Sequence, residues 1–187
     1  MRIISGSFKG KKILQPLDKN TRPLKDMTKE AIFNIINHSN KFSAEIINSN
    51  VLDLFSGVGS FGLECISRKA NHVTFVEYYS KTVKILQKNL ENLSANNNYK
   101  VLTEDIFKKK FFANLNYKYD IVFLDPPYRE KKIKDLLNNI CQEKILKKNG
   151  LIIIHRNKND VDEFPDNFKI IDEKIYGISK IFFGFLN

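Results

Sequence analysis

The feature that most constrains the fold of this chain is the stretch at residues 51–62, VLDLFSGVGSFG. Its first half is a short apolar run typical of a buried strand, and its second half is a glycine-rich turn that leads into the amphipathic pattern of a helix. Glycines let a ligand approach the backbone where a Cβ would collide, and the start of the helix offers unpaired N–H groups. The stretch therefore predicts a nucleotide-like ligand held through Gly57 and Gly59. Such glycines also serve tight packing of a strand against a helix, so the turn alone leaves the function open.

Acidic residues follow the predicted strands at their carboxyl ends. The run 73–77 ends in Glu77, about 20 residues beyond the glycines, where a carboxylate can bind both hydroxyls of a ribose. Asp105 and Asp125 follow two later apolar runs. Because the carboxyl ends of parallel strands meet at one edge of a sheet, we expect these acids to converge where open α/β sheets bind ligands.

These acids also separate two classes of nucleotide-like ligand. Several carboxylates would repel the pyrophosphate of NAD, above all Asp53, which lies just before the glycine turn. A cationic adenosine compound without phosphates would not be repelled. The charge pattern therefore favours S-adenosylmethionine over NAD as the cofactor.

The rest of the chain predicts an α/β fold with a doubly wound, mostly parallel sheet of seven strands. After the strand in the 51–62 stretch, strands are predicted at 73–77, 99–102, 120–124, 151–154, 169–176 and 179–186. The last two flank Gly177 so closely that they can pair only as an antiparallel hairpin.

Further helices are predicted from apolar stripes and turn residues. One begins after Asp26 as its N-cap and buries Met27, and another begins with Ser80 as its cap. A short helix is predicted over 106–115, and a later helix that starts near 133 is expected to be closed by Gly150.

The composition suits one domain, since 42% of the 187 residues are hydrophobic. We expect residues 50–187 to form the cofactor-binding core, and residues 1–40 to form a hairpin and helix that extend it. The net charge of +10 favours a polyanionic partner such as nucleic acid. The alternative is compositional drift, because the chain is rich in both Lys and Asn.

Other features point to a cytoplasmic protein. Cys65 and Cys141 each lie in an apolar helical pattern without paired spacing, so we expect reduced core cysteines. No signal peptide and no membrane-spanning run is recognisable. His38, His72 and His155 lack metal-ligand companions, so no metal is expected. A monomer is expected, because no long apolar surface stripe is left over.

The start of the chain predicts a hairpin of two short strands over residues 2–14. Its basic side chains can hold a phosphate backbone, and Phe8 offers a ring for stacking on a base. A solvated hairpin whose lysines only provide solubility is an equally good interpretation. The basic residues are Arg2, Lys9, Lys11 and Lys12.

The second informative motif is Asp125-Pro126-Pro127-Tyr128, directly after the fourth predicted strand; we call it the proline ledge. Two successive prolines fix φ and remove both backbone donors, so the ledge presents carbonyl oxygens without N–H groups. It can accept hydrogen bonds from an amino group while Tyr128 stacks on a flat heterocycle. The alternative is a strand that ends at prolines with a packed Tyr.

This motif suggests how an exocyclic amine of a nucleobase is methylated. The lone pair of such an amine is delocalised into the base, which makes it a poor nucleophile. If Asp125 and the Pro126 carbonyl accept its two hydrogens, the nitrogen can become pyramidal and direct its lone pair at a sulfonium methyl group. Asp125 or water then takes the proton, and positioning with exclusion of water supplies most of the acceleration.

Four segments, in the same order along the chain, resemble the RsmD family of bacterial methyltransferases, which act on the N2 amine of a guanine in small-subunit ribosomal RNA. They are residues 2–11, 21–34, 52–64 and 125–128. The resemblance implies a Rossmann-like class I methyltransferase that uses S-adenosylmethionine and modifies 16S rRNA in an assembled or partly assembled small subunit. The element at 125–128 alone is shared with adenine-N6 and cytosine-N4 methyltransferases.

The resemblance also implies site residues. Those expected at the cofactor are Asp53, Phe55, Ser56, Gly57, Gly59, Glu77, Asp105, Ile106 and Asp125. Those expected in catalysis are Asp125, Pro126, Pro127 and Tyr128, and those expected at the RNA are Arg2, Lys9, Lys11, Lys12 and Arg22. Ser56 and Val58 depart from the family's usual glycine loop but keep both glycines. His155 and Arg156 stand where the family often has an acid, so no role carries over to them.

Two other functions stay open from the sequence. A DNA amino-methyltransferase would use the same ledge, but that class usually carries a target-recognition segment for which this chain has little room. A catalytically silent RNA-binding assembly factor would keep the fold without the reaction.

Overall fold

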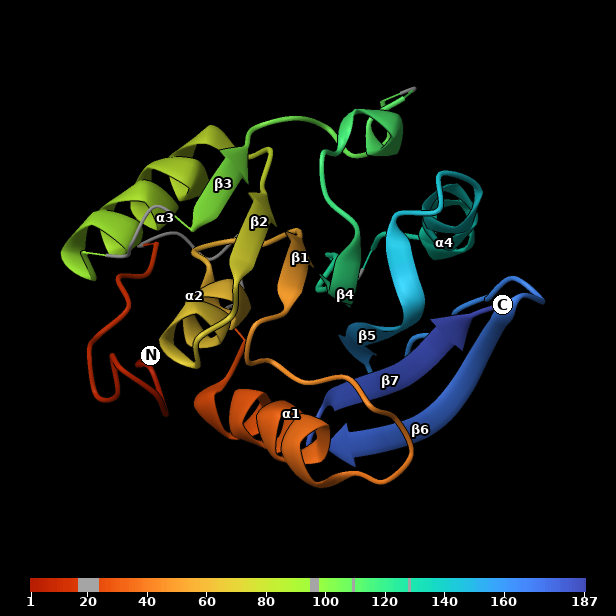
Figure 1. Ribbon diagram of the computed structural model, residues 1–187, viewed down its shortest axis with the longest axis horizontal. Coiled ribbons are helices and arrows are strands. Elements are labelled where there is room, and N and C mark those ends of the chain that lie inside the picture. The colour runs from red at the N-terminus through yellow and green to blue at the C-terminus, as the bar shows by residue number, and fades with distance from the viewer. Residues whose placement is uncertain (17–23, 95–97, 109, 128) are drawn as a thin grey trace.

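The computed structural model describes residues 1–16, 24–94, 98–108, 110–127 and 129–187. Its centre is a seven-stranded sheet with the strand order β3-β2-β1-β4-β5-β7-β6 (Figure 1). The strands are β1 (Asn50–Leu54), β2 (His72–Val76), β3 (Tyr99–Leu102), β4 (Tyr119–Leu124), β5 (Leu146–Asn157), β6 (Phe168–Tyr176) and β7 (Ser179–Leu186). The helices are α1 (Asp26–His38), α2 (Ser60–Ser67), α3 (Ser80–Asn92) and α4 (Ile133–Gln142), with a short 3₁₀ helix at Phe112–Asn114. The first five strands pair in parallel and β7 pairs antiparallel with β5 and β6, which confirms the predicted fold class.

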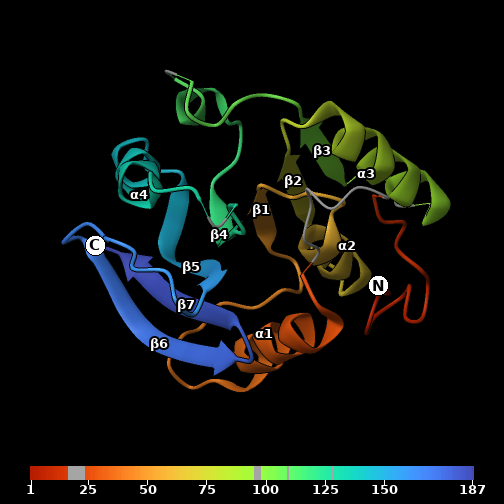
Figure 2. The same ribbon diagram turned by 180° about the vertical axis from the view of Figure 1, so that it is seen from behind.

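Helices cover both faces of the sheet. Val51 belongs to the apolar cluster that β1 shares with α1, α2 and α3, whereas Leu52 and Leu54 belong to the cluster shared with α4. Figures 1 and 2 accordingly show α4 on the side of the sheet away from α1 and α2. Because side chains alternate along a strand, Asp53 faces α2 together with Val51. Buried apolar residues on both faces are typical of a parallel sheet.

Stacked rings fix α2 on its face of the sheet. The ring of Phe61 lies between those of Phe33 from α1, at a centroid distance of 5.0 Å, and Phe123 from β4, at 4.1 Å. Such pairs contribute about 0.5–1.5 kcal/mol beyond the burial of their surface. Because Phe61 lies in the first turn of α2, this stacking fixes the position of the start of the helix and of the glycine turn before it.

The predicted helix caps are wrong. Lys25 is the N-cap of α1, which starts at Asp26, and the side chain of Lys25 makes no capping hydrogen bond. The Asp26 carboxylate instead lies 3.7 Å from the ammonium group of Lys29. Ser80 is likewise the first residue of α3 rather than its cap, because Tyr79 holds the N-cap position.

The buried face of α1 also differs from the prediction. Met27 is 83% exposed, whereas the side chain of Lys29 is fully buried. A lysine belongs on this face because the equally buried carboxylate of Glu64 lies opposite it, 3.7 Å from its ammonium group.

The short helix predicted over 106–115 is reduced, among the described residues, to the 3₁₀ helix at its end. Phe111 and Phe112 are both buried, and their rings meet edge to face at 5.0 Å. Adjacent residues of an α-helix do not face the same side, so a regular helix could not bury both rings together.

Two smaller predictions are also wrong. Gly150 lies inside β5 and does not close α4, and a Cβ at this position would lie 3.1 Å from the carbonyl oxygen of Tyr119. The glycine therefore serves a close approach between strands. Cys141 is only half-buried, while Cys65 is fully buried as expected, and both thiols are free.

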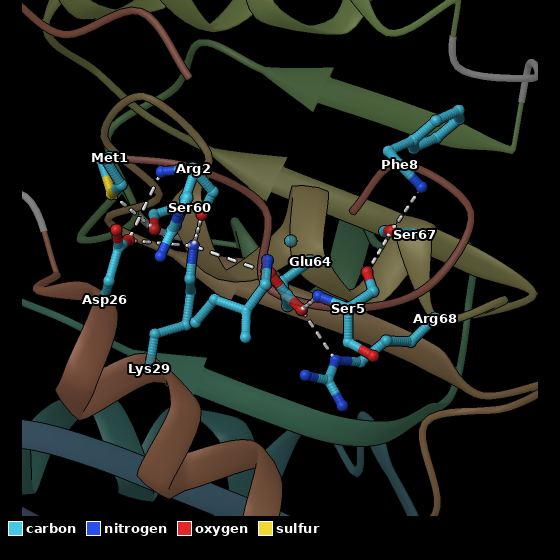
Figure 3. A network of polar contacts seen from close by, with 12 residues as sticks. Met1, Arg2, Ser5, Phe8, Asp26, Lys29, Ser60, Glu64, Ser67 and Arg68 are labelled. Atoms are coloured by element: carbon cyan, nitrogen blue, oxygen red, sulfur yellow. Dashed lines mark hydrogen bonds and ion pairs between the residues drawn. The ribbon is translucent and has the colours of Figure 1, made fainter. Parts of the chain in front are cut away.

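The N-terminal segment (residues 1–14) turns back on itself as the predicted hairpin, with the Ile3 N–H bonded to the Lys11 carbonyl and the Ile13 N–H to the Met1 carbonyl, each at 3.0 Å. Its two arms share only a single antiparallel bridge, between Arg2 and Lys12, in place of the two predicted strands. Side chains of α2 also hold the segment (Figure 3). The carboxylate of Glu64 accepts hydrogen bonds from two successive backbone N–H groups of the segment, at 2.8 and 2.9 Å. The hydroxyl of Ser67 accepts a third backbone hydrogen bond at 3.0 Å.

Glu64 also joins the segment to two cations. Its carboxylate accepts a hydrogen bond from Nε of Arg68 at 2.9 Å and pairs with Lys29, whose ammonium group donates to the Arg2 carbonyl at 2.7 Å. Burial lowers the pKa of Lys29, although the negative charges of Glu64 and Asp26 oppose this shift. Removing one partner of a buried pair costs about 3–5 kcal/mol, so the pair ties α1, α2 and the segment into one unit.

Gly6 determines how closely the segment approaches α2. Its φ is +81°, and a Cβ there would lie 1.9 Å from the backbone oxygen of Ser67. Gly10 has a similar φ of +85°, but no atom lies within 4 Å of the corresponding Cβ position.

We expect Gly6→Ala to detach the N-terminal segment, because the Ser67 oxygen also accepts the Ser7 N–H at 2.8 Å. Gly10→Ala is the matched control, since both substitutions carry the left-handed strain of about 1–2 kcal/mol but only one creates the overlap. Hydrogen exchange of the Ser7 amide should rise far more in Gly6→Ala. Equal exchange in the two variants would contradict close approach as the reason for this glycine.

Candidate active site

The carboxyl ends of four parallel strands meet in one row of the sheet. Leu54 of β1 pairs with Val76 of β2 and with Leu124 of β4, and Leu124 pairs with Ile154 of β5. The residues that follow this row are Phe55, Glu77, Asp125 and His155. The register therefore places acids on both sides of the glycine turn, as the sequence predicts for this edge.

The glycine turn is bent by a left-handed backbone. Phe55, Gly57 and Gly59 have φ values of 58°, 55° and 87°. For a residue with a side chain, such as Phe55, this conformation costs on the order of 1–3 kcal/mol and persists where its surroundings enforce it, often at binding sites. A Cβ on Gly59 would also lie 2.5 Å from Leu86 of α3, so tight packing explains this glycine in part.

Glu77 is bonded to the turn. Its carboxylate accepts the Gly57 N–H and the Tyr79 N–H, each at 2.8 Å and each on a different oxygen. Every carboxylate oxygen has a second lone pair, so Glu77 can hold the turn and still accept the hydroxyls of a ribose.

Asp53 lies beneath the turn. Its side chain is buried and accepts the Gly62 N–H at 2.9 Å, which satisfies one of the unpaired donors at the start of α2. Burial raises the pKa of Asp53 well above its usual range, the Gly62 hydrogen bond opposes this, and the charges of Asp125 and Glu77 raise it further. The structure thus gives Asp53 a role in shaping the turn, and its predicted contact with the cofactor stays a prediction.

Asp105 and Ile106 follow β3 at the same edge. The Asp105 carboxylate accepts the Phe107 N–H at 2.9 Å, and Ile106 is buried in the apolar cluster on the α4 side. The ring of Phe107 lies 6.3 Å from that of Phe55 in the turn. Asp105 and Ile106, which are predicted to flank the adenine, therefore lie close to the glycine turn.

The residues of this edge fit an adenosyl sulfonium compound. The buried hydroxyl of Ser56 has no hydrogen-bond partner within the described parts of the chain. A buried polar group left in this state costs about 1–3 kcal/mol, which a ligand at the turn would recover. Glu77, Asp105 and Asp125 supply negative charge, which suits a cation better than a pyrophosphate.

The proline ledge follows β4 beside the turn, and the Asp125 N–H bonds to the Leu54 carbonyl of β1 at 3.3 Å. The Pro127 carbonyl accepts the Glu130 N–H at 2.8 Å and Nη1 of Arg156 at 3.2 Å. Within the described residues, no donor reaches the Pro126 carbonyl. Tyr128 lies outside the described residues, so its predicted stacking role stays a prediction.

The structure adds residues that the sequence reasoning missed. Nδ1 of His155 lies 2.8 Å from the Asp125 carboxylate, and Arg156 bonds to the ledge through the Pro127 carbonyl. The signal was a pair of polar residues directly after the apolar run of β5, but their partners are 29 and 30 positions away in sequence.

The predicted RNA-contacting residues of the N-terminal segment are exposed along α2. The Phe8 N–H bonds to Ser67 at the end of α2, and Nζ of Lys11 lies 5.0 Å from the centre of the Phe8 ring. Arg2 follows Met1, whose sulfur accepts a hydrogen bond at 2.9 Å from Ser60 at the start of α2, next to the glycine turn. The predicted residues on the segment are Arg2, Lys9, Lys11 and Lys12. Arg22 lies outside the described residues.

Two hollows, of about 250 and 510 Å³, lie near the connection from α1 to β1, at the opposite edge of the sheet. Residues 43–45 and Ile47 line both, and none of the described residues that line them is one predicted for binding or catalysis. We therefore place the candidate active site at the carboxyl edge and not in these hollows.

A family model described as Conserved hypothetical protein 95 matches residues 1–184. The chain belongs to this family. It is 35% identical to ribosomal RNA small subunit methyltransferase D of Buchnera aphidicola (from Acyrthosiphon pisum), over 92% of this chain and 86% of that protein. The Haemophilus influenzae protein of the same name is 31% identical, over 95% of this chain and 90% of its own length. The expected membership of the RsmD family is thereby confirmed.

A solved structure agrees with this assignment. The yhhF protein of Escherichia coli has 29% identity to this chain and a TM-score of 0.78, over 98% of this chain and 96% of the other. The structural similarity to this protein therefore extends over nearly the whole of this chain.

Two features are absent from the parts of the chain that the structure describes. There, no helix combines the length and apolar character needed to cross a bilayer. No group of three or more His, Cys, Asp or Glu side chains in these parts is placed to bind a metal ion.

We expect Glu77→Gln to weaken the binding of S-adenosylmethionine by about tenfold or more, because a hydrogen bond to a charged group contributes about 1.5–3 kcal/mol. Glu104→Gln removes the same charge from an exposed position at the same edge and is the control. Titration calorimetry should show little change for the control. Equal losses in both variants would mean that only the overall charge of the edge matters.

Proposed function

We propose that this protein transfers a methyl group from S-adenosylmethionine to the exocyclic N2 amine of a guanine in small-subunit (16S) ribosomal RNA. The observation that carries the proposal is the position of Asp125, one residue past the row where β1 and β4 pair, between the glycine turn and two prolines. Membership of the RsmD family supports the reaction class and the ribosomal RNA substrate.

The cofactor binds along the carboxyl edge. The turn at residues 55–59 contacts it through backbone groups, Glu77 accepts its ribose hydroxyls, and Asp105 with Ile106 flanks its adenine. S-adenosylmethionine supplies an activated methyl group on a sulfonium centre. The carboxylates around it attract this positive charge and would repel a phosphate-bearing ligand.

The target amine is held by the proline ledge. Asp125 accepts one of its hydrogens and the Pro126 carbonyl accepts the other, because the Pro127 carbonyl is already occupied by Arg156 and Glu130. The nitrogen can then direct its lone pair at the methyl group. An N–C bond forms as the S–C bond breaks, and Asp125 or water accepts the proton that the amine releases.

The ribosomal RNA is held by charge. The chain carries a net charge of +10, and the exposed basic residues of the N-terminal segment are rigidly attached through Glu64 to the helix that starts at the glycine turn. We propose that this segment, together with Arg22, contacts the phosphate backbone while Tyr128 stacks on the target base. Following the resemblance, we propose an assembled or partly assembled small subunit as the substrate and a cytoplasmic monomer as the active form.

Methyl transfer from tritiated S-adenosylmethionine to unmodified small subunits, naked 16S rRNA and DNA tests the function. We expect N2-methylguanosine in the ribosomal RNA, identified by mass spectrometry of the nucleosides. Methylated adenine or cytosine in DNA would instead establish a DNA amino-methyltransferase. RNA binding without transfer to any substrate would establish a silent assembly factor.

Asp125→Ala is expected to lower the rate of transfer by about 10²–10⁴-fold, since it removes an acceptor of the amine hydrogens. Cofactor affinity should fall by less than about tenfold, which corresponds to about 1.4 kcal/mol. The exposed Asp166→Ala is the control for the loss of one carboxylate. Near-normal turnover of Asp125→Ala would show that the ledge does not hold the amine.

Replacing Lys9, Lys11 and Lys12 together by Ala is expected to flatten the dependence of RNA affinity on salt. Each lost phosphate contact reduces the magnitude of the slope of log affinity against log salt concentration by about 0.7–0.9. The loss of three contacts should therefore reduce this magnitude by about 2–3. The same change at Lys144, Lys147 and Lys148, near the opposite edge of the sheet, is the control. An unchanged slope in the first variant would mean that these lysines do not contact RNA phosphates and only provide solubility.

A further inference from the structure

Two buried polar residues of β5 lie directly behind the proline ledge. His155 and Arg156, which follow the apolar run 151–154 in the strand, are only 6% and 2% exposed. Because Leu124 pairs with Ile154, the residues that follow this pair, Asp125 and His155, lie next to each other. His155 and Arg156 stand where the RsmD family often has an acid, so the resemblance assigns them no role.

His155 links Asp125 to the hairpin at the edge of the sheet. Its Nδ1 lies 2.8 Å from Oδ1 of Asp125, and its Nε2 lies 2.9 Å from Oγ of Ser179 in β7. A carboxylate only accepts hydrogen bonds, so Nδ1 carries the proton and donates it to Asp125. In the neutral ring Nε2 then accepts from the Ser179 hydroxyl, which fixes the tautomer and the ring plane. His155 thereby binds Oδ1 of Asp125 and leaves Oδ2 as a further acceptor.

Arg156 holds the chain that follows Asp125. Its Nη1 donates to the Pro127 carbonyl at 3.2 Å and its Nη2 donates to the Glu130 carbonyl at 3.0 Å. The guanidinium is anchored in turn by Asp162, whose two oxygens lie 2.9 and 3.0 Å from Nε. The planar fork of an arginine can satisfy these partners together, which a lysine cannot.

His155 and Arg156 bond to the proline ledge from opposite faces of the sheet. Ile153 belongs to the apolar cluster on the α2 side and Ile154 to the cluster on the α4 side. Because side chains alternate along β5, His155 follows Ile153 and Arg156 follows Ile154. A pair of buried polar residues that only filled the core would not both bond to the ledge, on either side of Pro126.

We propose that His155 and Arg156 are positioning residues for methyl transfer. His155 orients the carboxylate of Asp125 toward the amine, and Arg156 fixes the ledge and occupies the Pro127 carbonyl, so that the Pro126 carbonyl receives the second hydrogen. This inference rests on the proposed function, because it assumes that the ledge holds a nucleobase amine. Neither residue touches the substrate.

Kinetics of His155 variants provide the first test. His155→Leu should lower kcat by about 10- to 100-fold, the usual effect of losing a residue that orients a catalytic group. Cofactor affinity and KM for the RNA should stay within about twofold of the wild type. His155→Asn keeps an N–H donor near the position of Nδ1 and should recover most of the rate. Wild-type kcat in His155→Leu, or no recovery in His155→Asn, would overturn the role of His155.

Arg156→Lys provides a second test that needs no turnover. It keeps the positive charge beside Asp162 but cannot bond both carbonyls, so hydrogen exchange of the Glu130 amide, which donates to Pro127, should rise. The amides of β4 should be unchanged. If exchange at Glu130 does not change, Arg156 does not hold the ledge.

These outcomes are separate from a failure of the proposed function. If the wild type methylates an amine other than guanine N2, the proposed substrate is wrong, yet the kcat comparison can be repeated on that amine. If the wild type methylates guanine and His155→Leu does so equally well, only the positioning role is wrong.

Discussion

The parallel pairing of β1 with both β2 and β4 is the constraint on which the rest of this protein depends. It brings the residues after Leu54, Val76 and Leu124 to one edge, so that Glu77 and Asp125 flank the glycine turn. Burial raises the pKa of Asp53 beneath the turn, and the nearby charges of Asp125 and Glu77 raise it further. A cationic ligand relieves this repulsion, and a methyl donor with a sulfonium centre provides both the charge and the reacting group.

A second set of buried charges connects the N-terminal segment, which we propose to contact the RNA, to this edge. Glu64 lies one turn after the start of α2 and bonds to the N-terminal segment, to Lys29 of α1 and to Arg68 (Figure 3). A buried carboxylate with so many partners is costly to leave unpaired, so the segment has one docked position. The basic residues on it therefore stand at a fixed place relative to the glycine turn, because Met1 also accepts a hydrogen bond from Ser60 at the start of α2.

Much of the fold and of the site could be predicted from the sequence, because apolar runs of strand length and the acids that end them are local signals. Glu77 and Asp125 followed from the rule that parallel strands present their carboxyl ends at one edge. The burial of Lys29 could not be predicted, since its reason is Glu64, which lies on another helix. The same holds for the N-terminal segment, whose backbone donors meet a carboxylate 59 and 60 positions later in the chain. From the sequence, His155 and Arg156 were only a departure from the family pattern, because their contacts with Asp125 and Pro127 depend on the register between β4 and β5.

The most direct test of this account is a crystal structure of the protein with S-adenosylhomocysteine, the product left after methyl transfer. The account predicts ribose hydroxyls on Glu77, the ligand against the turn at residues 55–59, and its sulfur directed at the Asp125 carboxylate and the Pro126 carbonyl. A ligand bound in the hollows around residues 43–47, or with its sulfur directed away from Asp125, would contradict it.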